Sequence, residues 1–234
     1  MVADAVIYHP SLAHYLKYAS TTIGRDKLLR TIQYFARFYA WYLHRTNGLP
    51  STIASFATLK SQLGLIRKVL RVGKNVEHLK LAAQASDARG GDPVLKAATV
   101  GRQLGYAGYL TFDAGTVLDA LGVKKSPRAK TLQREAYRFW AFGLVCSVFA
   151  QTYTLYQLRL REAKVDAKDG EGVVESKRIT LERFSSRLQL LSDVCDLTIP
   201  LSALGWIGLD DGIVGLAGTT SSIIGIYSQW KKTA

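Results

Sequence analysis

The residues whose types and spacing most clearly suggest a chemical role are a row of cations between Lys60 and Lys74. At about 100° per residue around a helix, these side chains gather on one side, and His78 extends the row by a turn. Each cation near an anionic surface contributes about 1 kcal/mol of attraction, so several together give substantial binding. This row, called the cationic stripe below, consists of Lys60, Arg67, Lys68, Arg71 and Lys74.

The helix that positions the cationic stripe is predicted to run without interruption from Phe56 to Gln84, with Glu77 as its single acid. Its opposite side is wide and apolar. Such a helix suits the boundary between lipid headgroups and acyl chains, where insertion into one leaflet curves the membrane. A core helix with cations along its rim would show the same pattern. The apolar side contains Leu59, Leu63, Ile66, Val69, Leu70, Gly73 and Val76.

The charge of the chain is strongly asymmetric. The net charge is +13; residues 1–138 hold 21 Lys/Arg and 8 Asp/Glu, whereas residues 139–234 hold 10 of each. A basic region can bind nucleic acid or an anionic membrane. The sequence has no zinc-finger, helix-turn-helix or RRM signature, and its cations lie beside large apolar faces. We therefore expect an anionic phospholipid membrane as the partner, and no nucleic acid.

The expected fold class is all-α, because strand-like alternation is weak and long helical segments are separated by glycine and proline. Residues 1–130 form a basic region of amphipathic helices. Residues 131–234 form a membrane-anchoring region with two charge-free segments, 139–158 and about 212–230, each long enough to be a transmembrane helix. Polar residues within 139–158 leave a buried core helix as the alternative.

Small residues in the last charge-free segment indicate close helix packing. They recur at intervals that share a helix face: Gly212, Gly215, Gly218 and Gly225. A shorter helix over 176–198 has apolar residues at heptad-like spacing, which predicts either packing against its neighbours or a contact between subunits.

Catalytic patterns are weak throughout the sequence. The four histidines and the two cysteines, Cys146 and Cys195, lack metal-ligand or redox spacing. Asp210 and Asp211 are adjacent, so on a helix they point to different sides. The glycine-rich run 212–218 lacks the Lys-Ser/Thr pair of a phosphate-binding loop. We therefore predict a protein that is not an enzyme and that uses no metal or cofactor.

Two segments resemble the peroxin-11 family of peroxisomal membrane proteins. The first is GRDKLLRTIQYFARF at residues 24–38, and the second is KSQLGLIRKVLRVGKNVEHLK at residues 60–80. The order of helices and late apolar stretches is similar over essentially the full length. The likeness is greatest to the members from filamentous fungi.

This resemblance implies a protein that curves and elongates the peroxisomal membrane during proliferation and fission. It implies self-association into a homo-oligomer and cooperation with fission machinery that includes a dynamin-like GTPase. The cationic stripe would contact lipid headgroups, while Leu59, Leu63, Ile66, Val69 and Leu70 would enter the leaflet. A non-selective channel for small metabolites is the alternative function.

The expected location is the peroxisomal membrane, with the chain integral to it. Two transmembrane helices would place both termini in the cytosol and residues 159–198 in the matrix. The cationic N-terminal region would then face the cytosol, in agreement with the cations that close the C-terminal segment.

Overall fold

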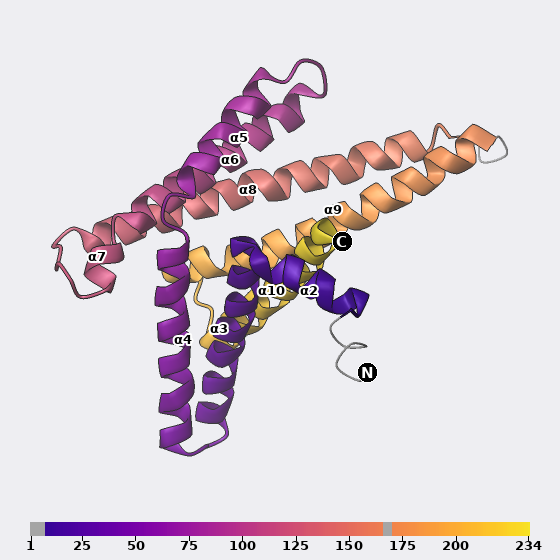
Figure 1. The fold of residues 1–234 in the computed structure, drawn as a ribbon. Coiled ribbons are helices and arrows are strands. Elements are labelled where there is room, and N and C mark those ends of the chain that lie inside the picture. Colours follow the sequence, from indigo (N-terminus) through magenta and orange to yellow (C-terminus); the bar gives the residue numbers. More distant parts are fainter. Residues whose placement is uncertain (1–7, 166–169) are drawn as a thin grey trace. The chain divides into compact units, whose positions relative to one another are not determined.

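The structure is a computed structural model that describes residues 8–165 and 170–234. The regular structure of this part of the chain is α-helical, as the sequence predicts (Figure 1). The chain packs into two compact units: unit 1 is Met1–Leu70 with Leu209–Ala234, and unit 2 is Arg71–Gly208. These units are defined by the packing of the helices, whereas the expected regions 1–130 and 131–234 are defined by charge and by predicted membrane anchoring.

Unit 1 is built around α3 (Thr22–Arg45), which packs along both α4 (Pro50–Leu70) and α10 (Asp211–Thr233). The shorter α2 (Pro10–Ser20) packs against α3 and α10. Side-chain caps define where these helices begin: the Thr21 hydroxyl accepts from the Gly24 N–H, and the Asp210 carboxylate accepts from the Ile213 N–H. The last helix of the chain therefore completes the unit that the first helices begin.

Unit 2 consists of α5 (Asn75–Asp87), α6 (Pro93–Ala114), the short α7 (Val117–Ala120), α8 (Ala129–Glu162) and α9 (Gly170–Ala203). The helix α6 packs against α5 and α8, and α8 packs against α9. Asp92 caps α6 by accepting from the Val94 and Leu95 N–H groups, and Pro93 occupies the first turn. At the α6–α8 contact, a Cβ on Gly105 would lie 2.5 Å from the Gly143 Cα, so only glycine allows this approach.

A buried carboxylate lies at the α8–α9 contact of unit 2. Asp193 is 2% exposed. Its Oδ2 accepts from the Ser147 hydroxyl at 2.5 Å, and its Oδ1 accepts from the Gln189 amide at 2.8 Å. Burial raises the pKa of Asp193 above its ordinary value of 3.8, against the opposing charge of Arg102 and these hydrogen bonds. The contact thus favours the protonated carboxyl.

This raised pKa predicts how the Asp193→Asn variant should respond to pH. Above 3.8 the folded protein holds the Asp193 proton more tightly than the unfolded chain, so stability declines with rising pH until the raised pKa is passed. Asparagine carries no charge and keeps an oxygen for Ser147. We expect the variant to lose this decline, so that its stability relative to wild type increases with rising pH through the acidic range. Urea unfolding across the acidic range measures it; an unchanged pH slope would contradict this assignment.

The predicted transmembrane helices are wrong. Across residues 8–165 and 170–234, no helix combines the length with the apolar character that a membrane crossing requires. Residues 139–158 lie within α8 and residues 212–230 within α10, and both helices are long. Their charge-free segments contain too many glycines, hydroxyls and amides. A segment without charges need not be apolar, and the topology deduced from two crossings loses its basis.

The single helix predicted from Phe56 to Gln84 is also wrong, because α4 ends at Leu70 and α5 begins at Asn75. A turn joins them, and Gly73 has a positive φ of 83° there, a conformation that glycine adopts at little cost. Further on, α9 (Gly170–Ala203) begins before the helix expected over 176–198 and ends after it; residues 166–169 lie outside the described part.

Candidate lipid-binding surface

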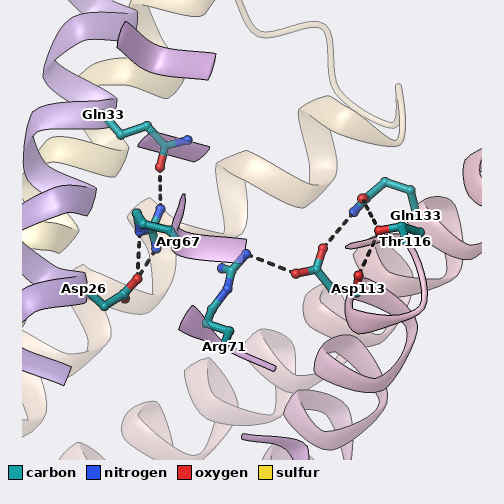
Figure 2. Close-up of polar contacts among 7 residues, drawn as sticks. All are labelled: Asp26, Gln33, Arg67, Arg71, Asp113, Thr116 and Gln133. Carbon is teal, nitrogen blue, oxygen red and sulfur yellow. Dashed lines mark hydrogen bonds and ion pairs between the residues drawn. The ribbon is translucent and has the colours of Figure 1, made fainter. Parts of the chain in front are cut away.

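In unit 1 the cations of α4 point toward the protein. Arg67 is 6% exposed. Its Nε donates to Asp26 Oδ1 at 2.9 Å, and its Nη1 donates to Gln33 Oε1 at 2.6 Å, with both acceptors on α3 (Figure 2). A buried guanidinium is tolerated only with such partners, because its desolvation is costly. Arg67 therefore contributes to the α3–α4 contact.

Lys60, the next cation of the same side, reaches the first residue of α10. Its Nζ lies 3.2 Å from Asp211 Oδ2, while Arg37 of α3 donates to Asp211 Oδ1 at 2.6 Å. Partial burial would raise the pKa of Asp211, but the hydrogen bond from Arg37 and the charges of both cations outweigh it and lower that pKa. Asp211 thus stays ionised and joins α3, α4 and α10.

The remaining members of the cationic stripe include two that lie in unit 2. Arg71 Nη2 donates to Asp113 Oδ2 at 3.1 Å, and its guanidinium lies over the Tyr109 ring. Asp113 is buried and also accepts from the Gln133 amide at 3.4 Å, next to Thr116 (Figure 2). Lys74 of this unit and Lys68 of unit 1 are half-buried.

Two polar side chains of α5 likewise point toward α6 in unit 2. The Asn75 amide donates to the Thr111 hydroxyl at 3.0 Å, and His78 Nδ1 lies 2.7 Å from Gln103 Oε1. Burial is the main cause that lowers the pKa of His78, so the imidazole is biased toward its neutral form. The basic extension that His78 was expected to add is therefore weakened at neutral pH.

The apolar side of α4 is exposed instead. Leu63 is buried in unit 1, but the other residues expected to enter the leaflet are 38–46% exposed: Leu59, Ile66, Val69 and Leu70. In unit 2, Val72, Val76 and Leu79 are exposed as well. A surface helix of a water-soluble domain buries its apolar side and exposes its charges. The helix α4 shows the reverse arrangement, which is suited to contact with lipid.

The carboxylates that hold the cationic stripe were missed from the sequence. Asp26 and Asp211 belong to unit 1 and Asp113 to unit 2. Their scarcity was an available signal, since Asp26 is one of only two acids among residues 1–70. An isolated acid inside a basic, apolar helix is costly unless a cation faces it.

The glycines of α10 lie against α3. A Cβ on Gly212 would lie 2.6 Å from the Trp41 ring, one on Gly215 2.6 Å from the Phe38 N, and one on Gly218 2.3 Å from the Tyr34 ring. A Cβ on Gly225 would meet the Lys27 side chain at 2.9 Å. The structure thus assigns these four positions to a helix contact within unit 1.

The cysteines and histidines form no evident reactive site. Within the described ranges, no three His, Cys, Asp or Glu side chains come together as metal ligands would. Cys146 and Cys195 are half-buried, and burial raises the pKa of both thiols, which disfavours the reactive thiolate. His14 instead helps to hold α2 on α10 through the Trp230 carbonyl at 3.0 Å.

The comparison with known protein families decides the identity of the chain. The family described as Peroxisomal biogenesis factor 11 (PEX11) matches residues 12–230. The chain belongs to the PEX11 family. The family predicted from residues 24–38 and 60–80 is therefore confirmed. The PEX11 family and its named members place the chain among peroxisomal membrane proteins involved in peroxisome biogenesis.

Individual relatives match over nearly the whole length. Peroxisomal membrane protein PMP30B of Candida boidinii is 30% identical over 254 residues, covering 100% of this chain and 99% of the relative. Peroxisomal membrane protein PMP27 of Saccharomyces cerevisiae is 28% identical, with 100% of both chains covered. Human peroxisomal membrane protein 11B is 26% identical and covers 92% of this chain and 95% of its own. No solved structure matches the chain significantly.

Proposed function

We propose that this PEX11 protein curves and elongates the peroxisomal membrane by inserting the exposed apolar side of α4 into one leaflet, and so promotes peroxisome proliferation and fission. The active element is mechanical and needs no catalytic residue or cofactor. A helix that lies in the plane of the membrane widens the headgroup layer on one side only. Many such helices at high surface density produce positive curvature.

The observation that carries this proposal is the reversed polarity of α4. Leu59, Ile66 and Leu70 form one exposed row, while Arg67 on the adjoining side is buried against α3. Fully burying an aliphatic side chain contributes about 1.5–3 kcal/mol, and each residue of this row still exposes 38–46% of its surface, so transferring the row from water into the acyl layer is favourable by about 2–4 kcal/mol. The row is presented on a folded helix, so insertion requires no coupled folding.

Headgroup contact by the cationic stripe belongs to the same proposal. When the apolar row points into the leaflet, Lys60 and Arg67 lie about 80–100° around the helix, at the level of the phosphates. Lys68, Arg71 and Lys74 would add to the attraction at an anionic surface. The strongly basic N-terminal half favours the cytosolic face for this contact.

Self-association and a link to the fission machinery complete the proposal. A homo-oligomer would raise the local density of inserted helices, which curvature requires. Recruitment of a dynamin-like GTPase would convert an elongated tubule into separate organelles. The support for both is the family resemblance and the exposed apolar residues that α8 and α9 retain in unit 2, among them Phe142, Phe149 and Phe184.

The test uses the full-length protein with vesicles of phosphatidylcholine alone or mixed with phosphatidylserine. We expect binding to the anionic vesicles, a decrease of binding with added salt, and tubules visible by electron microscopy. The salt dependence reports the cationic stripe, and the tubules report insertion. Release of an encapsulated solute without any change of vesicle shape would favour the channel instead and would overturn this proposal.

A further inference from the structure

The ion pair between Asp26 and Arg67 limits the conditions under which α4 can bind a membrane through Arg67. Arg67 is 6% exposed, and its guanidinium donates to Asp26 on α3 through Nε at 2.9 Å and Nη2 at 3.5 Å. Gln33 accepts from its Nη1 at 2.6 Å. These acceptors occupy the two sides of the guanidinium that a phosphate group would bind (Figure 2). The Arg67 guanidinium is thus already engaged and cannot bind a headgroup while these contacts persist.

Acids are scarce in unit 1, and the placement of those present is selective. The residues of this unit include eleven Lys/Arg and only four Asp/Glu. Of the three acids in the described part, Asp210 caps α10, whereas Asp26 and Asp211 both bind cations of α4. Asp211 also binds Arg37 of α3, so both acids lie where α4 contacts α3, on the side of α4 that borders its exposed apolar row.

Carboxylate and phosphate compete for a guanidinium through the same geometry. Both present paired anionic oxygens to the planar donor, and a phosphate can replace the carboxylate without leaving the cation unpaired. The exchange requires α4 to turn or move away from α3 at Arg67, because the residue is buried there. A membrane dense in phosphate groups therefore favours a separated state that water alone does not favour.

We propose that the Asp26–Arg67–Gln33 cluster is an internal latch, in which Asp26 stands in for a lipid phosphate and holds α4 on α3 until an anionic membrane displaces it. This inference rests on the proposed function and adds its regulation. Contact begins with the exposed apolar row, and the latch then opens as headgroups take over Arg67. The measured affinity for a membrane is reduced by the fraction of molecules that are still latched.

The decisive comparison is between Asp26→Asn and Asp210→Asn in the full-length protein. Both variants remove one negative charge from unit 1, but asparagine at 210 still caps α10 and leaves the latch intact. We expect Asp26→Asn to bind phosphatidylserine-containing vesicles about tenfold more tightly than Asp210→Asn and to depend more steeply on salt. Asp26→Glu keeps the pair and should restore behaviour close to wild type.

Several outcomes would overturn the latch. If wild type binds and tubulates vesicles but Asp26→Asn matches Asp210→Asn, the latch is wrong and the proposed function stands. If wild type itself does not bind, the proposed function fails first. Should circular dichroism show that Asp26→Asn is unfolded, Gln33→Met provides the test. It removes one acceptor of Arg67 without changing charge and should tighten binding about threefold; no tightening would also refute the latch.

Discussion

The double variant Leu59→Gln/Ile66→Gln is expected to lose membrane binding by about 30-fold, since the exposed parts of two inserted side chains together contribute about 2 kcal/mol. Both residues lie on the exposed row of α4, 38% and 46% exposed, so the substitutions change the surface of unit 1 and leave buried core residues such as Leu63 in place. Glutamine preserves helix propensity and adds no charge. Co-sedimentation of the full-length protein with anionic vesicles measures the loss, and tubulation should disappear with it.

A matched control for this variant lies on the neighbouring helix. Ile23 and Ile32 of α3 are 38% and 48% exposed, nearly the same as the pair on α4. The double variant Ile23→Gln/Ile32→Gln therefore removes the same amount of exposed apolar surface from the same unit. We expect it to retain most of the binding. Equal losses in the two variants would mean that α4 has no special role, and that general hydrophobicity of unit 1 drives the interaction.

The periodicity of residues 56–84 predicts helix and stripe, but it does not predict which side of the helix meets the protein. A basic stripe beside an apolar stripe has the same spacing whichever stripe faces inward. The orientation depends on Asp26, which lies 41 positions before Arg67. A partner so distant in the chain leaves no signal in the local sequence. The pairing of Arg67 and the exposure of Ile66 could therefore be recognised only in the folded unit.

The break between α4 and α5 illustrates a different limit. Gly73 was visible in the sequence, yet glycine inside a helical pattern is often tolerated. Tertiary packing decides whether the chain turns there, because α4 belongs to unit 1 and α5 to unit 2. The all-α class depends on many residues at once and was predictable. The end of a helix that depends on one residue, such as Gly73, was not predictable.

The side chains of the two charge-free segments explain why these segments lack the apolar character that a membrane crossing requires. In α8, Ser147 donates to the buried Asp193 of α9, so a residue within the segment serves a polar contact between helices. In α10, Gly215 and Gly218 serve close packing on α3. Segments that meet other helices through hydroxyls and glycines need no charge, and they also need not be apolar enough to cross lipid.

Gly215→Ala is expected to destabilise unit 1 by about 3 kcal/mol, because the added methyl group must displace one helix from another. A Cβ at this position would lie 2.6 Å from the Phe38 N and 2.8 Å from its Cα, and backbone atoms inside α3 cannot rotate away. The gain in helix propensity from alanine, about 1 kcal/mol, offsets only part of this cost. Thermal unfolding followed by circular dichroism should show a midpoint lowered by about 10 °C.

Gly208→Ala supplies the control for the same substitution at a site without neighbours. Nothing lies within 4 Å of a Cβ built there. Its unfolding midpoint should equal or slightly exceed that of wild type, because alanine restricts the unfolded chain. If Gly215→Ala were equally harmless, α10 could not approach α3 as closely as these distances require. The row of small residues in α10 would then have to serve a contact with another molecule.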